Sequence, residues 1–254
     1  MATKYYVVWK GREPGIFTDW PSCKKQIDQF PGARYKSYPN LLEAESAFKG
    51  NGAASKSNGK AGTKAVKKGG LKTYTAIEIT QLTAQTKIFT DGGCEPNPGE
   101  AGSGIAVYRE NALEELWYGL YNPNGTNNTA ELNALHQALM MAKDEIKKGL
   151  SVAIFCDSKY SIQCVTQWAV GWKKKGWKKA GGEIKNLELI QDMFACYQEI
   201  KNEIQVLHVN GHVGVEGNEL ADRMSILAIE QGDGEFTRYR KAINIDEILA
   251  TRAG

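Results

Sequence analysis

The sequence predicts an α/β protein in which a small α/β domain precedes a five-stranded mixed sheet flanked by helices. Three observations lead to this fold class. After residue 72, strand and helix patterns follow the order βββαβααβα, which favours a mixed sheet with helices packed against it. Residues 152–156 form an unbroken apolar run, typical of a central strand buried on both faces. Residues 50–70 contain no acidic or aromatic residue, which indicates a flexible basic linker.

We therefore divide the chain into a domain over 1–49, a linker over 50–71, a larger domain over 72–230 and a tail over 231–254. In the first domain we expect strands over 4–9, 16–17 and 34–38, and helices over 22–30 and 41–48. In the second we expect strands over 86–90, 102–108, 114–121, 152–156 and 205–209, and helices over 129–148, 159–170, 186–202 and 216–230. The tail is polar, with one amphipathic stretch over 243–249.

Composition narrows the class of protein. With 42% hydrophobic and 24% charged residues, the chain has the balance of a soluble globular protein. It contains no run near the roughly 18 apolar residues that a membrane span needs, and its first ten residues lack a secretion signal. Its five cysteines are scattered and lack metal-ligand spacing, which fits a reduced compartment. We expect a cytoplasmic protein without membrane contact.

Charge is distributed unevenly between the two ends. Residues 1–70 carry 13 Lys and Arg against 5 Asp and Glu, a net charge of +8. Residues 71–254 carry 19 against 24, a net charge of −5. The basic front end indicates a polyanionic partner, whereas the acidic remainder fits either a metal site or a solvated surface.

Four acids stand at positions suited to chemistry. Asp91 and Asp157 each end a predicted strand, where ligands of α/β sheets gather, while Glu131 and Asp222 lie on predicted helices. If the four converge, their mutual repulsion requires a counter-cation, and hard cations such as Mg²⁺ or Mn²⁺ suit carboxylate oxygens. Spacing alone does not establish convergence, because a single acid is usually a cap or a surface charge.

The neighbours of these acids resemble the motif set of type 1 ribonuclease H. The matching segments are Thr90-Asp91-Gly92-Gly93-Cys94, Asn97-Pro98-Gly99, Thr126-Asn127-Asn128-Thr129-Ala130-Glu131-Leu132, Asp157-Ser158, Gly211-His212 and Gly217-Asn218-Glu219-Leu220-Ala221-Asp222. The resemblance implies an endonuclease that hydrolyses the RNA strand of RNA–DNA hybrids with two Mg²⁺ ions, or Mn²⁺ in their place, and leaves 5′-phosphomonoesters. It implies that Asp91, Glu131, Asp157 and Asp222 bind the metals.

Further roles follow from the same resemblance. His212, which by itself would more often be structural, is expected to assist proton transfer or product release. Asn97, Asn127 and Asn128 match residues that reach into the minor groove. Thr126 and Asn186 match a pocket for a DNA phosphate, although Asn124 stands where the family has an arginine.

Residues 167–179 interleave three Trp with five Lys. This is either an amphipathic helix with a solvated basic face or a groove for phosphate and sugar. The resemblance favours the second interpretation, a basic protrusion that holds the DNA strand with Trp168 and Trp172.

The first domain resembles the hybrid-binding domain found before some type 1 ribonucleases H. The matching residues are Tyr5-Tyr6-Val7-Val8, Gly11-Arg12, Gly15-Ile16-Phe17, Trp20, Cys23, Phe30-Pro31-Gly32-Ala33-Arg34-Tyr35-Lys36 and Glu43-Ala44. By resemblance, Trp20 and Tyr35 contact the DNA sugar–phosphate and Lys36 a phosphate, while Ser37 stands where the family often has a second lysine. The alternative for Trp20 is a core position.

Two other functions remain open from sequence. One is a hybrid-binding scaffold without activity, against which the four acids and His212 argue. The other is a strand-transfer enzyme of the transposase or integrase kind, which shares acids on a similar sheet. The expected partner is an RNA–DNA hybrid, bound by a monomeric catalytic domain.

Overall fold

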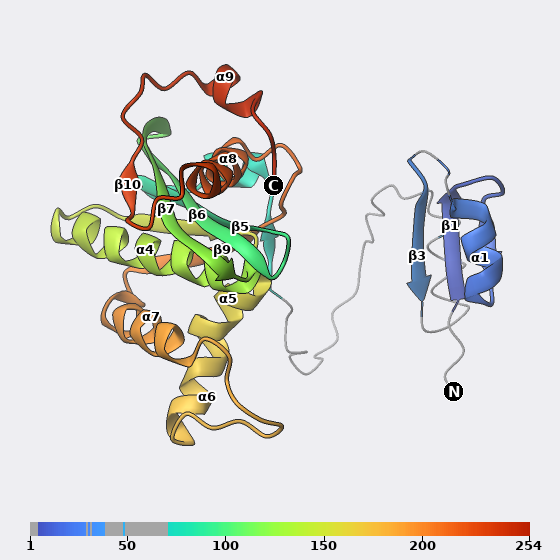
Figure 1. Ribbon diagram of the computed structural model, residues 1–254, viewed down its shortest axis with the longest axis horizontal. Coiled ribbons are helices and arrows are strands. Elements are labelled where there is room, and N and C mark those ends of the chain that lie inside the picture. Colours follow the sequence, from blue (N-terminus) through green and yellow to red (C-terminus); the bar gives the residue numbers. More distant parts are fainter. Residues whose placement is uncertain (1–4, 29, 31, 39–47, 49–70) are drawn as a thin grey trace, which may run out of the picture. The chain divides into compact units, whose positions relative to one another are not determined.

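The computed structural model describes residues 5–28, 30, 32–38, 48 and 71–254 (Figure 1). The chain divides into two compact units, residues 1–66 and 67–254, and each is described by itself. Residues 50–70 of the linker expected over 50–71 and, apart from Phe48, the helix expected over 41–48 lie outside the described residues.

The N-terminal unit is a three-stranded antiparallel sheet with one described helix beside it. Its strands are β1 (Tyr5–Lys10), β2 (Gly15–Phe17) and β3 (Arg34–Tyr38), in the order β2-β1-β3, and its helix is α1 (Trp20–Ile27). The helix starts two residues before the predicted position because Asp19 caps it, accepting a hydrogen bond of 2.8 Å from the Ser22 N–H. Val7 and Val8 of β1 and Cys23 of α1 are fully buried.

The larger unit is built on a seven-stranded mixed sheet in the order β10-β7-β6-β5-β8-β9-β4 (Figure 1). The strands are β4 (Thr73–Tyr74), β5 (Thr86–Glu95), β6 (Gly99–Arg109), β7 (Ala112–Gly125), β8 (Val152–Cys156), β9 (Ile204–Val209) and β10 (Thr237–Arg238). Five of them match the predicted sheet. The prediction of five strands is corrected by β4 and β10, which pair with the outer strands β9 and β7. A strand of two residues is too short to show an alternation of apolar and polar side chains, so the sequence pattern does not reveal β4 or β10.

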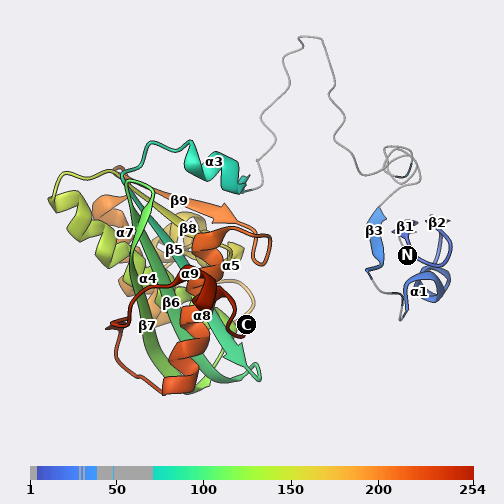
Figure 2. The same cartoon turned by 90° about the horizontal axis from the view of Figure 1, so that it is seen from above.

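Helices cover both faces of this sheet. The helices α4 (Asn127–Lys147) and α7 (Leu187–Ile200) lie on one face, and α8 (Glu216–Gln231) lies on the other (Figures 1 and 2). The pleat separates the two cores: Ile88 and Ile154 point towards α4, whereas Phe89 and Phe155 point towards α8. The run predicted as a central strand is β8, and all of its residues are buried.

The helix predicted over 159–170 has three parts. These are α5 (Lys159–Gln163), a π-helical turn η1 (Cys164–Trp168) and α6 (Ala169–Lys174). The Ala169 N–H donates to the Cys164 carbonyl, five residues back, in place of the usual four. A 3.6-residue apolar pattern does not predict such a turn.

Two short helices flank the sheet. The capping box of Thr75 and Glu78 fixes α3 (Ala76–Thr80), which the sequence analysis did not predict. The amphipathic stretch of the tail contains α9 (Ile245–Leu249), whose Ile248 is buried in the core on the α8 side. Among the described residues, the structure contains no helix long and apolar enough to span a membrane.

Candidate active site

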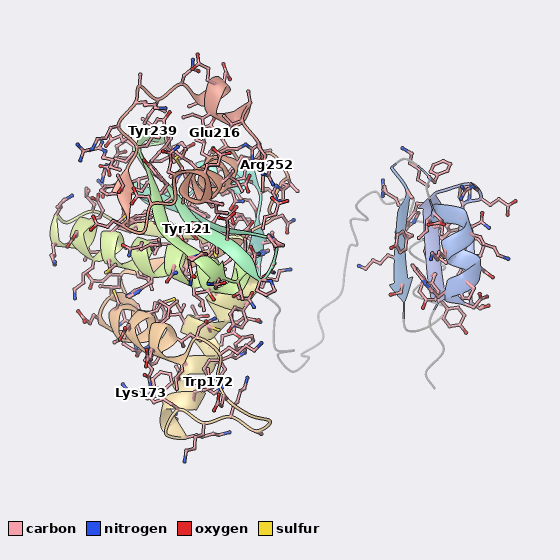
Figure 3. All side chains as sticks on the ribbon, in the orientation of Figure 1. Tyr121, Trp172, Lys173, Glu216, Tyr239 and Arg252 are labelled. Atoms are coloured by element: carbon pink, nitrogen blue, oxygen red, sulfur yellow. The ribbon has the colours of Figure 1, made fainter. Side chains whose placement is uncertain are left out.

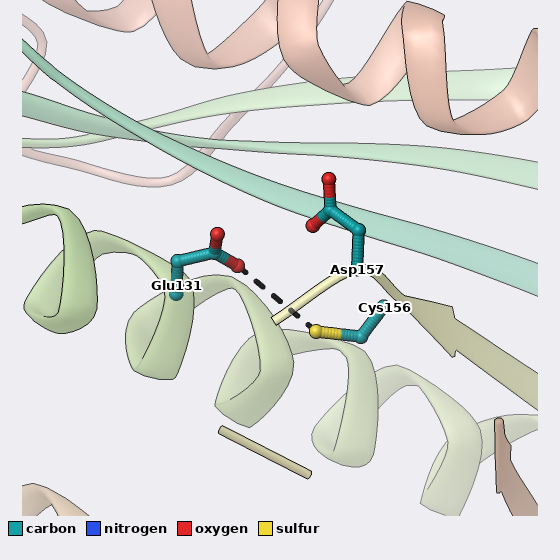
Figure 4. A group of neighbouring side chains, drawn as sticks. All are labelled: Glu131, Cys156 and Asp157. Atoms are coloured by element: carbon teal, nitrogen blue, oxygen red, sulfur yellow. Dashed lines mark hydrogen bonds between the residues drawn. The ribbon is translucent and has the colours of Figure 1, made fainter. Parts of the chain in front are cut away.

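The four predicted acids line one cavity of about 320 Å³, together with His212 and the last residues of the chain. Asp91 lies on β5 and Asp157 directly follows β8. Because these strands pair in parallel, with Thr90 opposite Cys156, the two acids leave the sheet side by side. Glu131 comes from the start of α4 and Asp222 from α8. Figure 4 shows Glu131 and Asp157 beside Cys156.

Two glycines allow the helices to approach the sheet closely enough to deliver their acids. A Cβ atom on Gly92 would lie 2.3 Å from the backbone nitrogen of Glu131, and one on Gly104 would lie 2.1 Å from the carbonyl oxygen of Ala221. Both distances are far shorter than a van der Waals contact, so α4 and α8 pack directly on the backbones of β5 and β6. This contact sets the depth of Glu131 and Asp222 in the cavity.

The cluster concentrates negative charge in a place with little solvent. Asp91 and Glu131 are each 6% exposed and Asp222 is 4% exposed. Burial raises the pKa of Asp91 well above its ordinary value, and the charges of Asp157 and Asp222 raise it further. Burial and the charges of Asp91 and Asp157 raise the pKa of Glu131 in the same way. A bound cation would relieve this repulsion.

The donor set fits a divalent cation. Ligand atoms of Glu131, Cys156 and Asp157 all lie within 4.8 Å of one another. Asp157 Oδ1 is buried and has no hydrogen-bond partner among the described residues, so its lone pairs are available to a ligand. The site offers mainly carboxylate oxygens, which suit hard cations.

Two residues that the sequence analysis did not assign hold Asp157. Asn218 Nδ2 donates to Asp157 Oδ2 over 3.2 Å, and a ring nitrogen of His208, Nε2, lies 3.1 Å from the Asp157 carbonyl oxygen. His208 is 2% exposed, and its Nδ1 lies 2.7 Å from the hydroxyl of Thr73 on β4. Asn218 belongs to the motif that ends in Asp222 and could have been identified from it. His208 lies in a predicted strand and matches no motif.

His212 lies in the loop before α8, at the edge of the cavity. Its side chain is exposed and its backbone has a φ of 53°, in the left-handed region. Burial raises the pKa of Asp157, whereas the hydrogen bond from Asn218 and the charge of His212 lower it. His212 therefore lies close enough to act on Asp157 electrostatically.

The polar residues expected to hold a phosphate form one connected group. The hydroxyls of Thr126 and Thr129 lie 2.7 Å apart, and Thr129 donates to Asn186 Oδ1 over 3.2 Å. Thr129 is an addition to the predicted pair. On the neighbouring turn, Asn97 Oδ1 accepts from the Asn127 backbone N–H at 3.3 Å, and the side chains of Asn127 and Asn128 are exposed.

The tryptophans of the basic segment differ from one another. Trp168 is 36% exposed and its ring centroid lies 5.9 Å from that of Trp172. Trp172 and Trp177, in contrast, pack against the core on the α4 side (Trp172 and Lys173 are labelled in Figure 3). Trp168 therefore faces solvent, whereas Trp172 and Trp177 anchor the protrusion to the core.

On the N-terminal unit, two of the predicted contact residues, Trp20 and Tyr35, lie side by side at the surface. Trp20 is 42% exposed and Tyr35 47% exposed, with ring centroids 5.9 Å apart. Trp20 is therefore not a core residue. The side chain of Lys36, next to Tyr35 on β3, is also exposed.

An α/β sheet with four acids converging at the ends of its strands and on the helices beside them is the arrangement expected of a divalent-metal-dependent nuclease. The comparisons identify which one. The RNase H family profile matches residues 83–230, and the profile described as the Ribonuclease H1 N-terminal domain matches residues 4–48.

Individual relatives agree with these profiles. The chain is 30% identical to Ribonuclease H1 of Rattus norvegicus over 91% of this chain and 90% of that protein. It is 41% identical to Ribonuclease H of Acidovorax sp. (strain JS42) over 58% of this chain and 96% of that protein. A solved structure, LC9-RNase H1, described as a type 1 RNase H with the type 2 active-site motif, shares the fold with a TM-score of 0.52, 23% identity, and coverage of 67% and 82%. The chain belongs to the ribonuclease H family and is an endoribonuclease with an N-terminal Ribonuclease H1 domain.

Proposed function

We propose that the chain hydrolyses the RNA strand of RNA–DNA hybrids with two Mg²⁺ ions, or Mn²⁺ ions, held by Asp91, Glu131, Asp157 and Asp222. When bound, two such ions activate a water and stabilise the leaving oxygen. The observation that carries the proposal is the convergence of four acids from β5, α4, the end of β8 and α8 on one cavity, with a buried oxygen of Asp157 left without a partner.

Recognition of the hybrid is divided between its two strands. The linked group of Thr126, Thr129 and Asn186 offers hydroxyl and amide donors to a DNA phosphate, and the exposed ring of Trp168 offers a stacking surface. Asn127 lines the cavity of the acids, and Asn97, Asn127 and Asn128 read the minor groove. There the RNA 2′-hydroxyl is the group that distinguishes RNA from DNA.

His212 serves proton transfer or product release. Its exposed ring at the edge of the cavity reaches solvent, and an imidazole can accept or donate a proton there. Asn218 and His208 are positioning residues, because each acts through Asp157.

The organisation of the chain completes the proposal. We assign hybrid binding to residues 1–49, a linker to 50–71, catalysis by a monomeric domain to 72–230 and a tail to 231–254. All five cysteines are unpaired, which supports a reduced cytoplasmic location.

The test is cleavage of a labelled RNA–DNA hybrid against single-stranded RNA, duplex RNA and duplex DNA, with and without Mg²⁺. We expect Mg²⁺-dependent cleavage of the hybrid alone. Asp91→Asn or Asp157→Asn should nearly abolish it while hybrid binding persists, because the charge that holds the cations is lost and the groove is kept. Asp144→Asn, which neutralises an exposed acid on α4, is the matched control. Turnover of the active-site variants within about tenfold of wild type, or about 1.4 kcal/mol of barrier, would refute the assignment.

A further inference from the structure

The last residues of the chain enter the cavity of the four acids. Arg252, Ala253 and Gly254 line it together with Asp222. The Gly254 N–H donates to both carboxylate oxygens of Asp222, at 3.1 and 3.2 Å. Arg252 forms an ion pair with Glu95, at the end of β5 (Arg252 is labelled in Figure 3). A segment outside the matched family region thus contacts an acid of the site.

The chain is directed into the cavity by the structure before it. Ile248 of α9 is 6% exposed and anchors this helix in the α8-side core. Asn244 caps the start of α9, accepting from the Glu247 N–H at 3.3 Å. After the helix, the backbone N–H and the hydroxyl of Thr251 both donate to the Ile248 carbonyl, at 3.1 and 2.7 Å. The segment is therefore held by packing and hydrogen bonds on its N-terminal side.

One buried guanidinium connects this helix to the active site. Arg223 donates from Nη1 to Asp222 Oδ2 and from Nη2 to the Leu249 carbonyl at the end of α9, at 3.3 Å. Its side chain is 10% exposed. The position of α9 and the orientation of the Asp222 carboxylate are thus fixed by the same residue.

We propose that residues 252–254 form an inhibitory strap that competes with the divalent cation for Asp222. This inference rests on the proposed function, because it takes Asp222 as a cation ligand. A carboxylate oxygen that accepts hydrogen bonds from the Gly254 N–H and the Arg223 guanidinium has fewer lone pairs free for a metal ion. The ion pair of Arg252 with Glu95, which also lines the cavity, holds the strap closed.

While the strap is closed, Asp222 is occupied, so the strap lowers the apparent affinity for the cation. A site that is competent only when open binds with a dissociation constant divided by the open fraction. Asp222 is the acid that the strap contacts, so the cation that depends on Asp222 is the one affected. The strap acts on the free enzyme, before any nucleic acid binds.

The test measures Mn²⁺ binding to the full chain by electron paramagnetic resonance, without nucleic acid. Three variants open the strap: deletion of 252–254, Gly254→Pro and Arg252→Gln. Gly254→Pro removes the N–H donor and keeps the charge of Arg252, so it separates hydrogen bonding from electrostatics. Arg240→Gln is the matched control, because it removes the same charge from an exposed residue of the same tail outside this cavity.

We expect the deletion, Gly254→Pro and Arg252→Gln to lower the Mn²⁺ dissociation constant roughly threefold to tenfold, with Arg240→Gln unchanged. Hydrogen exchange of the Gly254 amide should be slow in the metal-free protein and faster with Mg²⁺. Wild-type affinity in both the deletion and Gly254→Pro would overturn the strap. Mn²⁺ binding that is insensitive to Asp91→Asn would instead refute the cation site of the proposed function, so the two failures are distinguishable.

Discussion

Asn218 Nδ2 donates a hydrogen bond to Asp157 Oδ2 over 3.2 Å, from the start of α8 to the end of β8. Asn218 is 2% exposed, so it meets the carboxylate away from solvent. This bond leaves Asp157 Oδ1 free for the cation. An acid at the end of a strand thus owes its orientation to a residue more than sixty positions later in the chain.

Replacing Asn218 should impair turnover more than binding. Asn218→Asp removes the donor and places a like charge beside Asp157, and a lost bond to a charged group is worth about 1.5–3 kcal/mol. We expect kcat to fall roughly tenfold to a hundredfold, with little change of KM for the hybrid, and the acidic limb of the pH profile to move to higher pH. Asn202→Asp, at an exposed position, is the control. An unchanged pH profile would show that Asn218 has only a structural role.

Gly92→Ala should weaken the contact between α4 and β5. The new Cβ would lie 2.3 Å from the Glu131 nitrogen, so the helix must move and take Glu131 with it. We expect a loss of about 1–3 kcal/mol in the free energy of unfolding, measured with urea, as for other overpacked sites. Gly171→Ala is the control, since nothing lies within 4 Å of its added Cβ and alanine favours a helix. Equal stability of the two variants would contradict the close approach.

The acids at the ends of strands could be predicted from the sequence, whereas the residues that orient them were harder to predict. Asp91 and Asp157 follow apolar runs, so pattern and motif together locate them. His208 has the same pattern as any strand residue, and its role depends on the pairing of β8 with β9. Thr129 joins the phosphate group only because Asn186, in a separate loop, lies against the start of α4.

The same distinction applies to the fold. The order and type of the long helices and strands follow from the spacing of their apolar residues, because each element must place apolar side chains on the face that packs in the core. The two-residue strands β4 and β10 and the π turn in η1 depend on neighbours distant in sequence, so local pattern does not determine them. The sequence of the tail is mostly polar and does not indicate where the tail lies. The packing of Ile248 in the core brings Gly254 to Asp222.

Glu145 should stabilise the protein in a pH-dependent manner. Its carboxylate is 3% exposed and accepts hydrogen bonds from Arg109, Lys148 and Thr86 at 2.8 to 3.0 Å. The hydrogen bonds from Arg109 are the main cause that lowers the pKa of Glu145 to about 2. A lowered acid pKa contributes stability above the unfolded value, and this contribution is lost as the pH falls through the folded value.

Glu145→Gln should therefore cost about 2 kcal/mol of unfolding free energy near neutral pH, and the difference from wild type should shrink as the pH falls from about 4.5 towards 2. Urea denaturation at several pH values measures both. Asp144→Asn, which removes a neighbouring exposed acid, should change stability little at any pH. A difference that stays constant with pH would mean that shape, rather than charge, makes Glu145 stabilising.

The N-terminal unit should add hybrid affinity through two separable contributions. Phosphate contacts release counterions, so affinity that depends on them falls steeply with salt. Removing residues 1–70 should weaken hybrid binding most at low and moderate salt and flatten the log–log salt slope. Lys36→Ala should reduce that slope by about one unit if Lys36 contacts one phosphate.

Trp20→Ala should behave differently from Lys36→Ala. The exposed ring of Trp20 beside Tyr35 offers packing against a sugar, which carries no counterion, so affinity should fall at every salt concentration with little change of slope. The measurement is binding of a fluorescent hybrid across a salt series for wild type, the truncation and the two point variants. The kcat at saturating hybrid should stay constant in all four, because the acids lie in the other unit. If truncated and full-length proteins gave equal slopes and affinities, the N-terminal unit would not bind hybrids, and a protein partner would be its target.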